Sequence, residues 1–212
     1  MNNPIHRAHV LSEDEQARTL AVIGSRSRFP ARDRAIFALS HCAGLRVSEI
    51  AALNVSDVAE PAKAGLALRG SATLTKTKGD KPRSVYLDSP LLGKALRQYL
   101  IYLGAERAPS RRSVDCPLFL TQKGGRFNTA TMCQLFQRFY SAGWANVKNA
   151  KGHSGRRTFI TNLAEQGYNL KAIAQLAGHS SIQTTAIYIE TNPLQLKRMS
   201  ASATSAKLER LL

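Results

Sequence analysis

This sequence is poor in cysteine, in long apolar runs and in acidic residues. The three cysteines, Cys42, Cys116 and Cys133, are odd in number, far apart and outside any CxxC or metal-finger spacing, so we expect reduced, structural thiols. No stretch approaches the roughly 18 consecutive apolar residues that cross a bilayer, and the N-terminus lacks the apolar core of a secretory signal. Both absences predict a cytoplasmic protein.

Motifs for nucleotide and metal chemistry are also missing. The chain has no GxxxxGK[ST] loop and no cluster of carboxylates of the kind that two-metal enzymes use. We therefore expect no ATP, no metal and no other cofactor. No repeat, low-complexity block or interdomain linker is evident, and the 43% apolar and 21% charged content is ordinary, so residues 1–212 are expected to form a single domain.

Basic residues far outnumber acidic ones. The sequence has 30 Lys and Arg against 14 Asp and Glu, which gives a formal net charge of +16. A nucleic acid is the best-fitting partner, because each phosphate neutralised by Lys or Arg releases condensed counterions. A ribosome-associated protein or a merely basic surface would have a similar composition, so the motifs have to decide.

The spacing of apolar residues predicts helices over most of the chain. Ser12 to Glu15 has the capping-box form with Ser12 as N-cap, and this first helix is expected to end near Gly24. Pro30 is well placed to open a second helix that stops at Gly44. Further helices are expected at about 48–53, 90–103, 129–142, 155–166, 170–177 and 181–188, and from about 193 onward.

Between the third and fourth of these helices the pattern changes to strands. Residues 66–68, 73–75 and 85–87 are strand-like, and residues 78–81, Lys-Gly-Asp-Lys, form a basic turn. We expect one small antiparallel sheet with an exposed Lys-rich hairpin. The class is therefore α+β, mainly helical.

Four short patterns carry polar residues suited to phosphate chemistry. They are GLRVSEI with Arg46, TKG with Lys78, HSGR with His153 and Arg156, and LAGH with His179, followed by Tyr188. Each has an ordinary explanation when taken alone: a solvated arginine, a basic turn, a helix cap, or an aromatic half buried in the core. His153 and Arg156 are the more informative pair, because both face one way at a helix N-terminus, where backbone N–H groups favour an anion.

Taken together, Arg, Lys, His-x-x-Arg and His-x8-Tyr in this order resemble the tyrosine recombinase (phage integrase) family. Three sequence segments are similar to those of its Xer-type members: GLRVSEI, TKGDKPRSVYL and LAGHSSIQTTAIY. The resemblance covers about residues 11–192 and fills all six active-site positions. One departure is Arg157, where many relatives have a second His. The resemblance implies a tyrosine-recombinase catalytic-domain fold with a small antiparallel sheet.

The resemblance also implies a role for each residue in site-specific cleavage and rejoining of double-stranded DNA. Tyr188 would attack the phosphate to give a 3′-phosphotyrosine, and Arg46 and Arg156 would clamp the non-bridging oxygens. His179 would add a hydrogen bond, His153 would accept the proton of the nucleophile, and Lys78 would protonate the leaving oxygen. Glu49 could orient Arg46 or could form an ordinary surface salt bridge.

The same resemblance raises questions of assembly. Most relatives carry a DNA-clamping domain before the catalytic domain, and here only a short segment precedes the first helix. Either the sequence is a fragment, or it is a compact recombinase similar to the small fimbrial-switch invertases. We expect self-association on DNA as a tetramer, with an accessory DNA-bending protein as a further candidate partner. Residues 192–212 would pack on a neighbouring subunit or fold back on their own core.

Two other functions remain open at this point. A type IB topoisomerase shares the nucleophile and similar cationic groups, but it would relax supercoils as a monomer. A non-catalytic DNA-binding regulator derived from a recombinase would bind DNA without cutting it. The complete six-residue site argues against a regulator, and integration, excision, inversion and resolution all remain compatible with an active enzyme.

Overall fold

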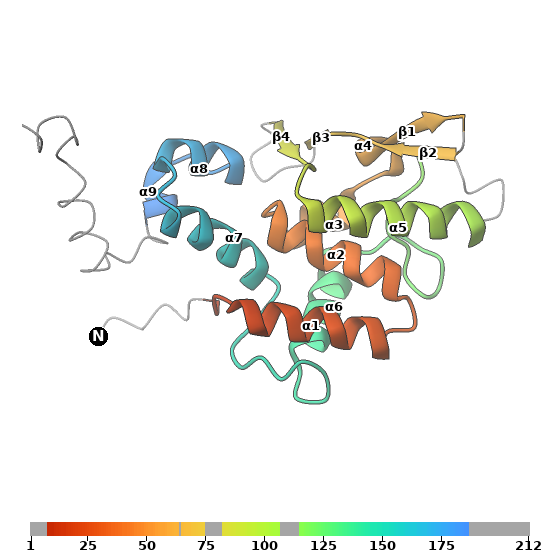
Figure 1. The fold of residues 1–212 in the computed structure, drawn as a ribbon, viewed down its shortest axis with the longest axis horizontal. Coiled ribbons are helices and arrows are strands. Elements are labelled where there is room, and N and C mark those ends of the chain that lie inside the picture. The colour runs from red at the N-terminus through yellow and green to blue at the C-terminus, as the bar shows by residue number, and fades with distance from the viewer. Residues whose placement is uncertain (1–7, 64, 75–81, 107–114, 187–212) are drawn as a thin grey trace, which may run out of the picture.

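The computed structural model describes residues 8–63, 65–74, 82–106 and 115–186. Helices dominate this part of the chain, and short strands lie along one side of it (Figure 1). The fold confirms the predicted α+β, mainly helical class. In chain order the elements are α1 (Glu13–Arg26), α2 (Pro30–Cys42), α3 (Val47–Ala52), α4 (Val55–Val58), β1 (Ala59–Ala62), β2 (Gly65–Leu68), β3 (Ser71–Leu74), β4 (Arg83–Tyr86), α5 (Pro90–Glu106), α6 (Thr129–Tyr140), α7 (Ser154–Glu165), α8 (Leu170–Ala177) and α9 (Ile182–Ala186).

The first two helices begin where the sequence predicts. Ser12 Oγ accepts a hydrogen bond from the Glu15 backbone N–H, and the Glu15 carboxylate accepts one from the Ser12 N–H, which confirms the capping box. Helix α1 does not end near Gly24 but continues to Arg26. Gly24 is instead a position where the Arg34 side chain lies close against the backbone of α1. A Cβ on Gly24 would come within 1.9 Å of the Arg34 guanidinium of α2.

The strands differ from the prediction of one sheet. Among the described residues they form two separate two-stranded antiparallel sheets, β1–β2 and β3–β4. In the first, Ala59 pairs with Leu68, and in the second, Ser71 pairs with Tyr86. The sequence prediction missed β1 because its residues, Ala-Glu-Pro-Ala, do not alternate between apolar and polar and include a proline. The basic turn at residues 78–81 lies outside the described residues.

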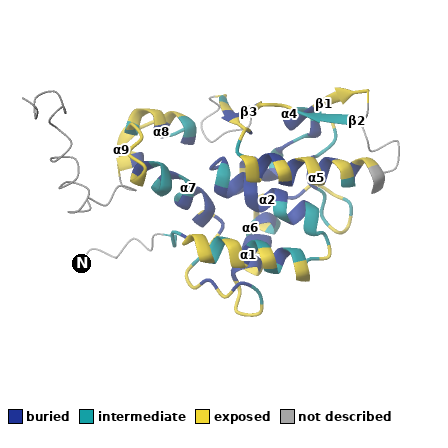
Figure 2. Cartoon of the chain, viewed as in Figure 1, coloured by how far each residue is buried: buried dark blue, intermediate teal, exposed yellow. Residues whose placement is uncertain are grey.

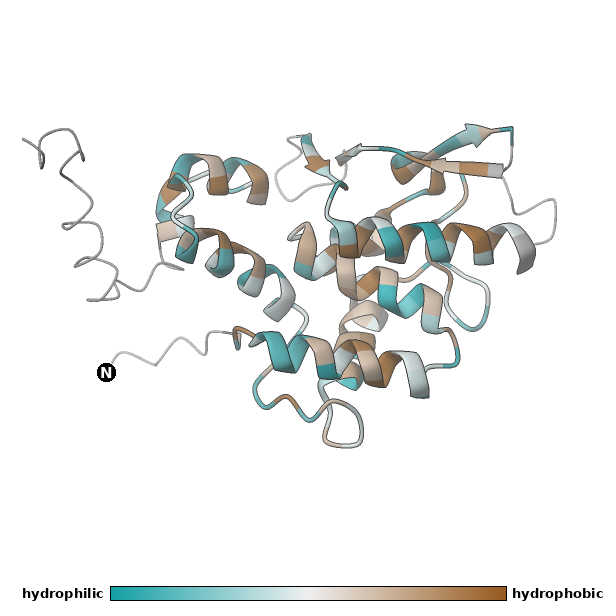
Figure 3. Cartoon of the chain, viewed as in Figure 1, coloured by the Kyte–Doolittle hydropathy of each residue, from teal (hydrophilic) through white to brown (hydrophobic). Residues whose placement is uncertain are grey.

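Helix α2 is the centre of the main core. Its Ile36, Phe37 and Leu39 are fully buried, and α1, α5 and α7 all pack against it (Figure 2). Apolar residues recur along α2 and α5 in Figure 3. A second, smaller apolar cluster joins α7 to α8 through Ile160 and Ile173. Helix α7 thus packs on both α2 and α8 and links the two clusters.

The sequence predicts reduced cysteines and no membrane-spanning helix. The cysteines Cys42, Cys116 and Cys133 are free thiols, as expected. In the parts of the chain that the structure covers, no helix is long and apolar enough to cross a membrane. The expected helix from residue 193 lies outside the described residues, and the single-domain assignment stays a prediction.

Candidate active site

Four of the six predicted site residues belong to described elements, and these elements bring them together. Arg46 is the N-cap of α3, His153 the N-cap of α7, Arg156 lies in the first turn of α7, and His179 follows the C-cap of α8. The charges of Arg46 and Arg156 both act on the two histidines, which places the four side chains in one electrostatic environment. Lys78 and Tyr188 lie outside the described residues.

The C-terminal end of α8 organises the cationic side of this site. Three consecutive backbone carbonyls accept hydrogen bonds from three guanidiniums that come from different parts of the chain: Leu176 from Arg83 (2.6 Å), Ala177 from Arg156, and Gly178 from Arg46 (3.2 Å). The last carbonyls of a helix lack partners within the helix and carry the negative end of its dipole. The three arginines therefore satisfy the last carbonyls of α8, and the end of this helix fixes three cationic side chains.

Arg156 is fixed from a second side by the end of α2. Its side chain is buried, and its Nη1 donates to the Gly44 carbonyl at 2.7 Å. Gly44 has a φ of +62°, and a Cβ there would come within 2.4 Å of the Phe159 ring. Only glycine fits this turn without strain. The turn leads directly into Arg46, so the same bend positions both arginines.

Arg46 is held by Glu49, and this carboxylate is buried with only 2% of its surface exposed. Glu49 accepts hydrogen bonds from the Arg46 Nη1 and backbone N–H, both at 2.8 Å, and from Arg83 Nη2 at 2.8 Å. Burial would raise the pKa of Glu49, but the hydrogen bonds and charges of Arg83 and Arg46 lower it below its ordinary value. The alternative of a surface salt bridge was wrong, because Glu49 is a buried bridge between two arginines.

Arg83 is the member of this cluster that the sequence analysis missed. It opens β4, and its guanidinium joins Glu49 to the end of α8. A signal was present: alternation along a strand puts residues 83 and 85 on the same face, and Val85 is an inward-facing apolar residue. An arginine on the buried face of a strand needs a partner, and Glu49 provides one.

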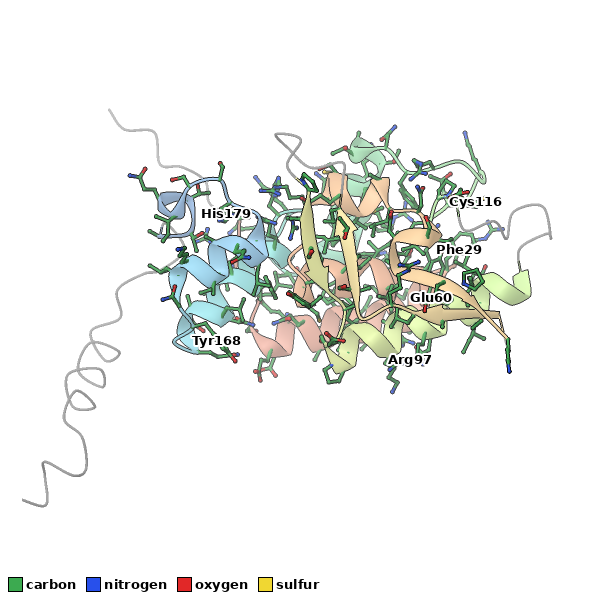
Figure 4. All side chains as sticks on the ribbon, turned by 90° about the horizontal axis from the view of Figure 1, so that it is seen from above. Phe29, Glu60, Arg97, Cys116, Tyr168 and His179 are labelled. Carbon is green, nitrogen blue, oxygen red and sulfur yellow. The ribbon has the colours of Figure 1, made fainter. Side chains whose placement is uncertain are left out.

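The two histidines are neutral at neutral pH. Burial and the charges of Arg156, Arg46 and Arg83 lower the pKa of His179 to about 4, and its Nδ1 lies 2.8 Å from the hydroxyl of the buried Thr185. Desolvation and the charges of Arg156 and Arg46 also lower the pKa of His153. Figure 4 places His179 and Tyr168 at opposite edges of the C-terminal helices. A site with this excess of positive charge favours an anion, and a planar guanidinium matches the oxygens of a phosphate.

A family model described as the phage integrase family matches residues 9–195. The chain belongs to the phage integrase family. This phage integrase chain is 29% identical over 181 residues to tyrosine recombinase XerC from Syntrophus aciditrophicus (strain SB), a match that covers 84% of the chain and 55% of the relative. The chain spans about half the length of the curated relatives it matches.

Solved structures of family members have the same fold. The crystal structure of XerA recombinase matches with a TM-score of 0.71 at 28% identity, covering 95% of this chain and 67% of that one. The crystal structure of XerH site-specific recombinase bound to difH substrate matches with a TM-score of 0.68 at 21% identity, covering 96% and 57%. These matches confirm the expected tyrosine-recombinase catalytic-domain fold.

Proposed function

We propose that this chain is the catalytic domain of a tyrosine site-specific recombinase, which cuts and rejoins double-stranded DNA through a 3′-phosphotyrosine on Tyr188. The observation that supports this best is the convergence of Arg46, Arg156 and two neutral histidines beside the end of α8. Family membership supports it as well, because the XerC relative is named a tyrosine recombinase and XerH is named a site-specific recombinase and was solved bound to difH substrate.

In this proposal Arg46 and Arg156 hold the phosphate that is attacked. Negative charge grows on the non-bridging oxygens as the nucleophile approaches, and two preorganised guanidiniums stabilise it. A guanidinium has five N–H donors, so bonds to backbone carbonyls and to a phosphate are compatible. Neutral His179 donates a further hydrogen bond to the same phosphate without adding a third full charge.

Proton transfer completes the step. A tyrosine with a pKa of about 10 needs roughly 4 kcal/mol to ionise at pH 7, and His153, neutral at that pH, can accept its proton. The Tyr188 oxygen bonds to phosphorus as the bond from phosphorus to the 5′ oxygen breaks, and Lys78 protonates the departing oxygen. The products are a 3′-phosphotyrosine and a free 5′-hydroxyl. Attack by the 5′-hydroxyl of a partner strand reverses the step and rejoins DNA with no cofactor.

The partners belong to the proposal too. Exchange between two duplexes needs four cleavages, so the chain acts on DNA as a tetramer, with an accessory DNA-bending protein as a further partner. Residues 192–212 are the segment proposed to pack on a neighbouring subunit. The site of action is the cytoplasm, and integration, excision, inversion and resolution are the same chemistry on different arrangements of sites.

A trapping experiment tests the function without knowledge of the target. The protein is incubated, without metal or ATP, with duplexes that carry a nick within randomised sequence, so that cleavage releases a short fragment and leaves the protein attached. We expect a covalent adduct on a denaturing gel and one enriched sequence in the recovered DNA. Binding without any adduct would contradict the proposal and favour a regulator. Plasmid relaxation without sequence preference would favour a type IB topoisomerase.

A further inference from the structure

We propose that Arg83 is a positioning residue for the cleavage step: it fixes Glu49, and through Glu49 it sets the place of the Arg46 guanidinium. The inference rests on the function proposed above, in which Arg46 contacts the phosphate. The role given to Arg83 needs no contact with the phosphate: its Nη1 and Nη2 donate to Leu176 and Glu49, and its Nε is buried.

The first observation is the bridge that Arg83 makes. Its side chain is only 8% exposed, and its Nη1 donates to the Leu176 carbonyl at 2.6 Å while its Nη2 donates to Glu49 Oε2 at 2.8 Å. The two acceptors belong to α8 and α3, and Arg83 itself opens β4. One side chain therefore joins three elements that meet at the site.

The second observation is how Glu49 divides its oxygens. Oε1 accepts from the Arg46 guanidinium, whereas Oε2 accepts from Arg83 and from the Arg46 backbone N–H. With Arg83 present, the carboxylate binds the Arg46 guanidinium through Oε1, and Oε2 is held by Arg83 and the Arg46 backbone N–H. Without Arg83, Oε2 would lose its side-chain partner, and the buried carboxylate would turn toward Arg46 as its one remaining cation. Arg46 would then be drawn away from the position that it shares with the Gly178 carbonyl.

The third observation is that the backbone makes room for Arg83. A Cβ on Gly178 would lie 2.3 Å from Arg83 Cδ and 2.8 Å from its Nε. The stem of Arg83 thus lies against the residue whose carbonyl binds Arg46. A lysine could reach one of the two acceptors of Arg83 as a point donor, but it cannot bridge both with a planar fork.

The test compares Arg83→Lys and Arg83→Met with a matched control, Arg32→Met. Arg32 is also a buried arginine, 9% exposed, that pairs with one carboxylate, Asp33, and one backbone carbonyl, Leu120. It lies at the start of α2, about 15 Å along the helix from the site end. Single-turnover adduct formation is measured at saturating protein, well below the unfolding temperature, on the DNA sequence that the wild type selects.

We expect Arg83→Lys and Arg83→Met to slow adduct formation by about 10–100-fold, with DNA affinity changed by less than about threefold. Arg32→Met should lose thermal stability and keep its rate. A full rate in Arg83→Lys would overturn the proposal, because charge alone would then suffice. An equal loss in Arg32→Met would overturn it as well, since any buried arginine would then matter.

A second substrate separates two routes by which Arg83 could act. Sulfur in place of the 5′ bridging oxygen gives a thiolate leaving group that needs no proton, so this substrate compensates for a misplaced general acid. Arg83 acts through Glu49 and Arg46, so the modified substrate should not restore the rate of Arg83→Lys. Restoration would overturn the proposal and place the effect at the proton donor.

A phosphate titration keeps this inference distinct from the proposed function. If the wild type forms no adduct, the function fails, and the positioning role is then decided by the dissociation constant for inorganic phosphate, followed by the NMR signals of His179 and His153. Weaker binding in Arg83→Lys than in the wild type and Arg32→Met is the expected result. Unchanged binding in Arg83→Lys would overturn the role.

Discussion

The side chains around the site carry more positive than negative charge. Arg46 and Arg83 share the carboxylate of Glu49, and Arg156 donates to the carbonyls of Gly44 and Ala177. Carbonyl dipoles at the end of α8 stabilise the charge of all three arginines. Protonating His179 would add another cation, which is one reason why its pKa falls to about 4. The phosphodiester of the proposed DNA substrate would bring negative charge to this site, so charge balance favours the proposed binding.

Because His41 is buried, we expect the protein to lose stability at low pH. It is buried beneath the first turn of α7, stacks on Phe37 with 3.8 Å between ring centroids, and its Nε2 lies 3.1 Å from the Tyr140 hydroxyl. Burial lowers its pKa to about 3, below the unfolded value of about 6.5. Between these two pH values the unfolded chain binds a proton that the folded chain excludes.

The stability that depends on neutral His41 is therefore complete above pH 6.5 and is lost as the pH falls toward 3, by up to about 1.4 kcal/mol per pH unit. Urea unfolding at a series of pH values measures this slope. His41→Gln keeps a group near Tyr140 that cannot titrate, so its slope should be smaller. Equal slopes in the two proteins would contradict the assignment to His41.

At the scale of elements, the end of α8 depends on one backbone conformation. Gly178 has a φ of +64° and lies against Arg83, whereas Gly167, with a φ of +83° after α7, has nothing within 4 Å of the position of a Cβ. Gly178→Ala and Gly167→Ala should both cost about 1–2 kcal/mol for the left-handed backbone. Gly178→Ala should in addition displace Arg83 and slow adduct formation by about 100-fold.

Urea unfolding and single-turnover adduct formation, measured on both variants, test this. Gly167→Ala is the control, because it has the same backbone strain without the clash. A rate in Gly178→Ala that equals the rate in Gly167→Ala would show that the end of α8 does not need close packing on Arg83.

The helices could be predicted from sequence more fully than the strands. Local signals, which do not depend on distant residues, predicted three features of the helices: the cap at Ser12, Pro30 as the first residue of α2, and the bounds of α8. The division of the strands into two sheets could not be predicted, because pairing depends on contacts between segments. Strand β1, which contains Glu60 and Pro61, pairs with residues 65–68, and local propensity does not indicate that pairing.

Some residues of the site could likewise be predicted from the sequence, and others could not. Arg46, His153, Arg156 and His179 could be named from the spacing of residue types, and the structure brings these four together. The partners that hold them could not be named, because Glu49, Arg83 and the carbonyls of residues 176–178 meet only in the folded chain. The burial of Glu49 is a tertiary property, and for that reason the sequence left its role open.

At the scale of the whole molecule, a net charge of +16 predicts the response to salt. Binding that rests on neutralised phosphates weakens as salt replaces the released counterions. We expect the affinity for a random-sequence duplex, measured by fluorescence anisotropy, to fall about a hundredfold or more between about 50 and 200 mM salt. An affinity that does not change with salt would contradict a phosphate-directed surface and leave the charge without this role.

Whether Tyr188 is the nucleophile is decided by finding the residue that carries the covalent bond to DNA. The trapped DNA adduct is digested with nuclease and trypsin, and mass spectrometry identifies the peptide that carries the nucleotide phosphate. We expect the peptide of residues 172–197, in which Tyr188 is the only tyrosine, with the phosphate on that residue and no adduct from Tyr188→Phe. Phosphate on any other peptide, or an adduct that survives Tyr188→Phe, would contradict it.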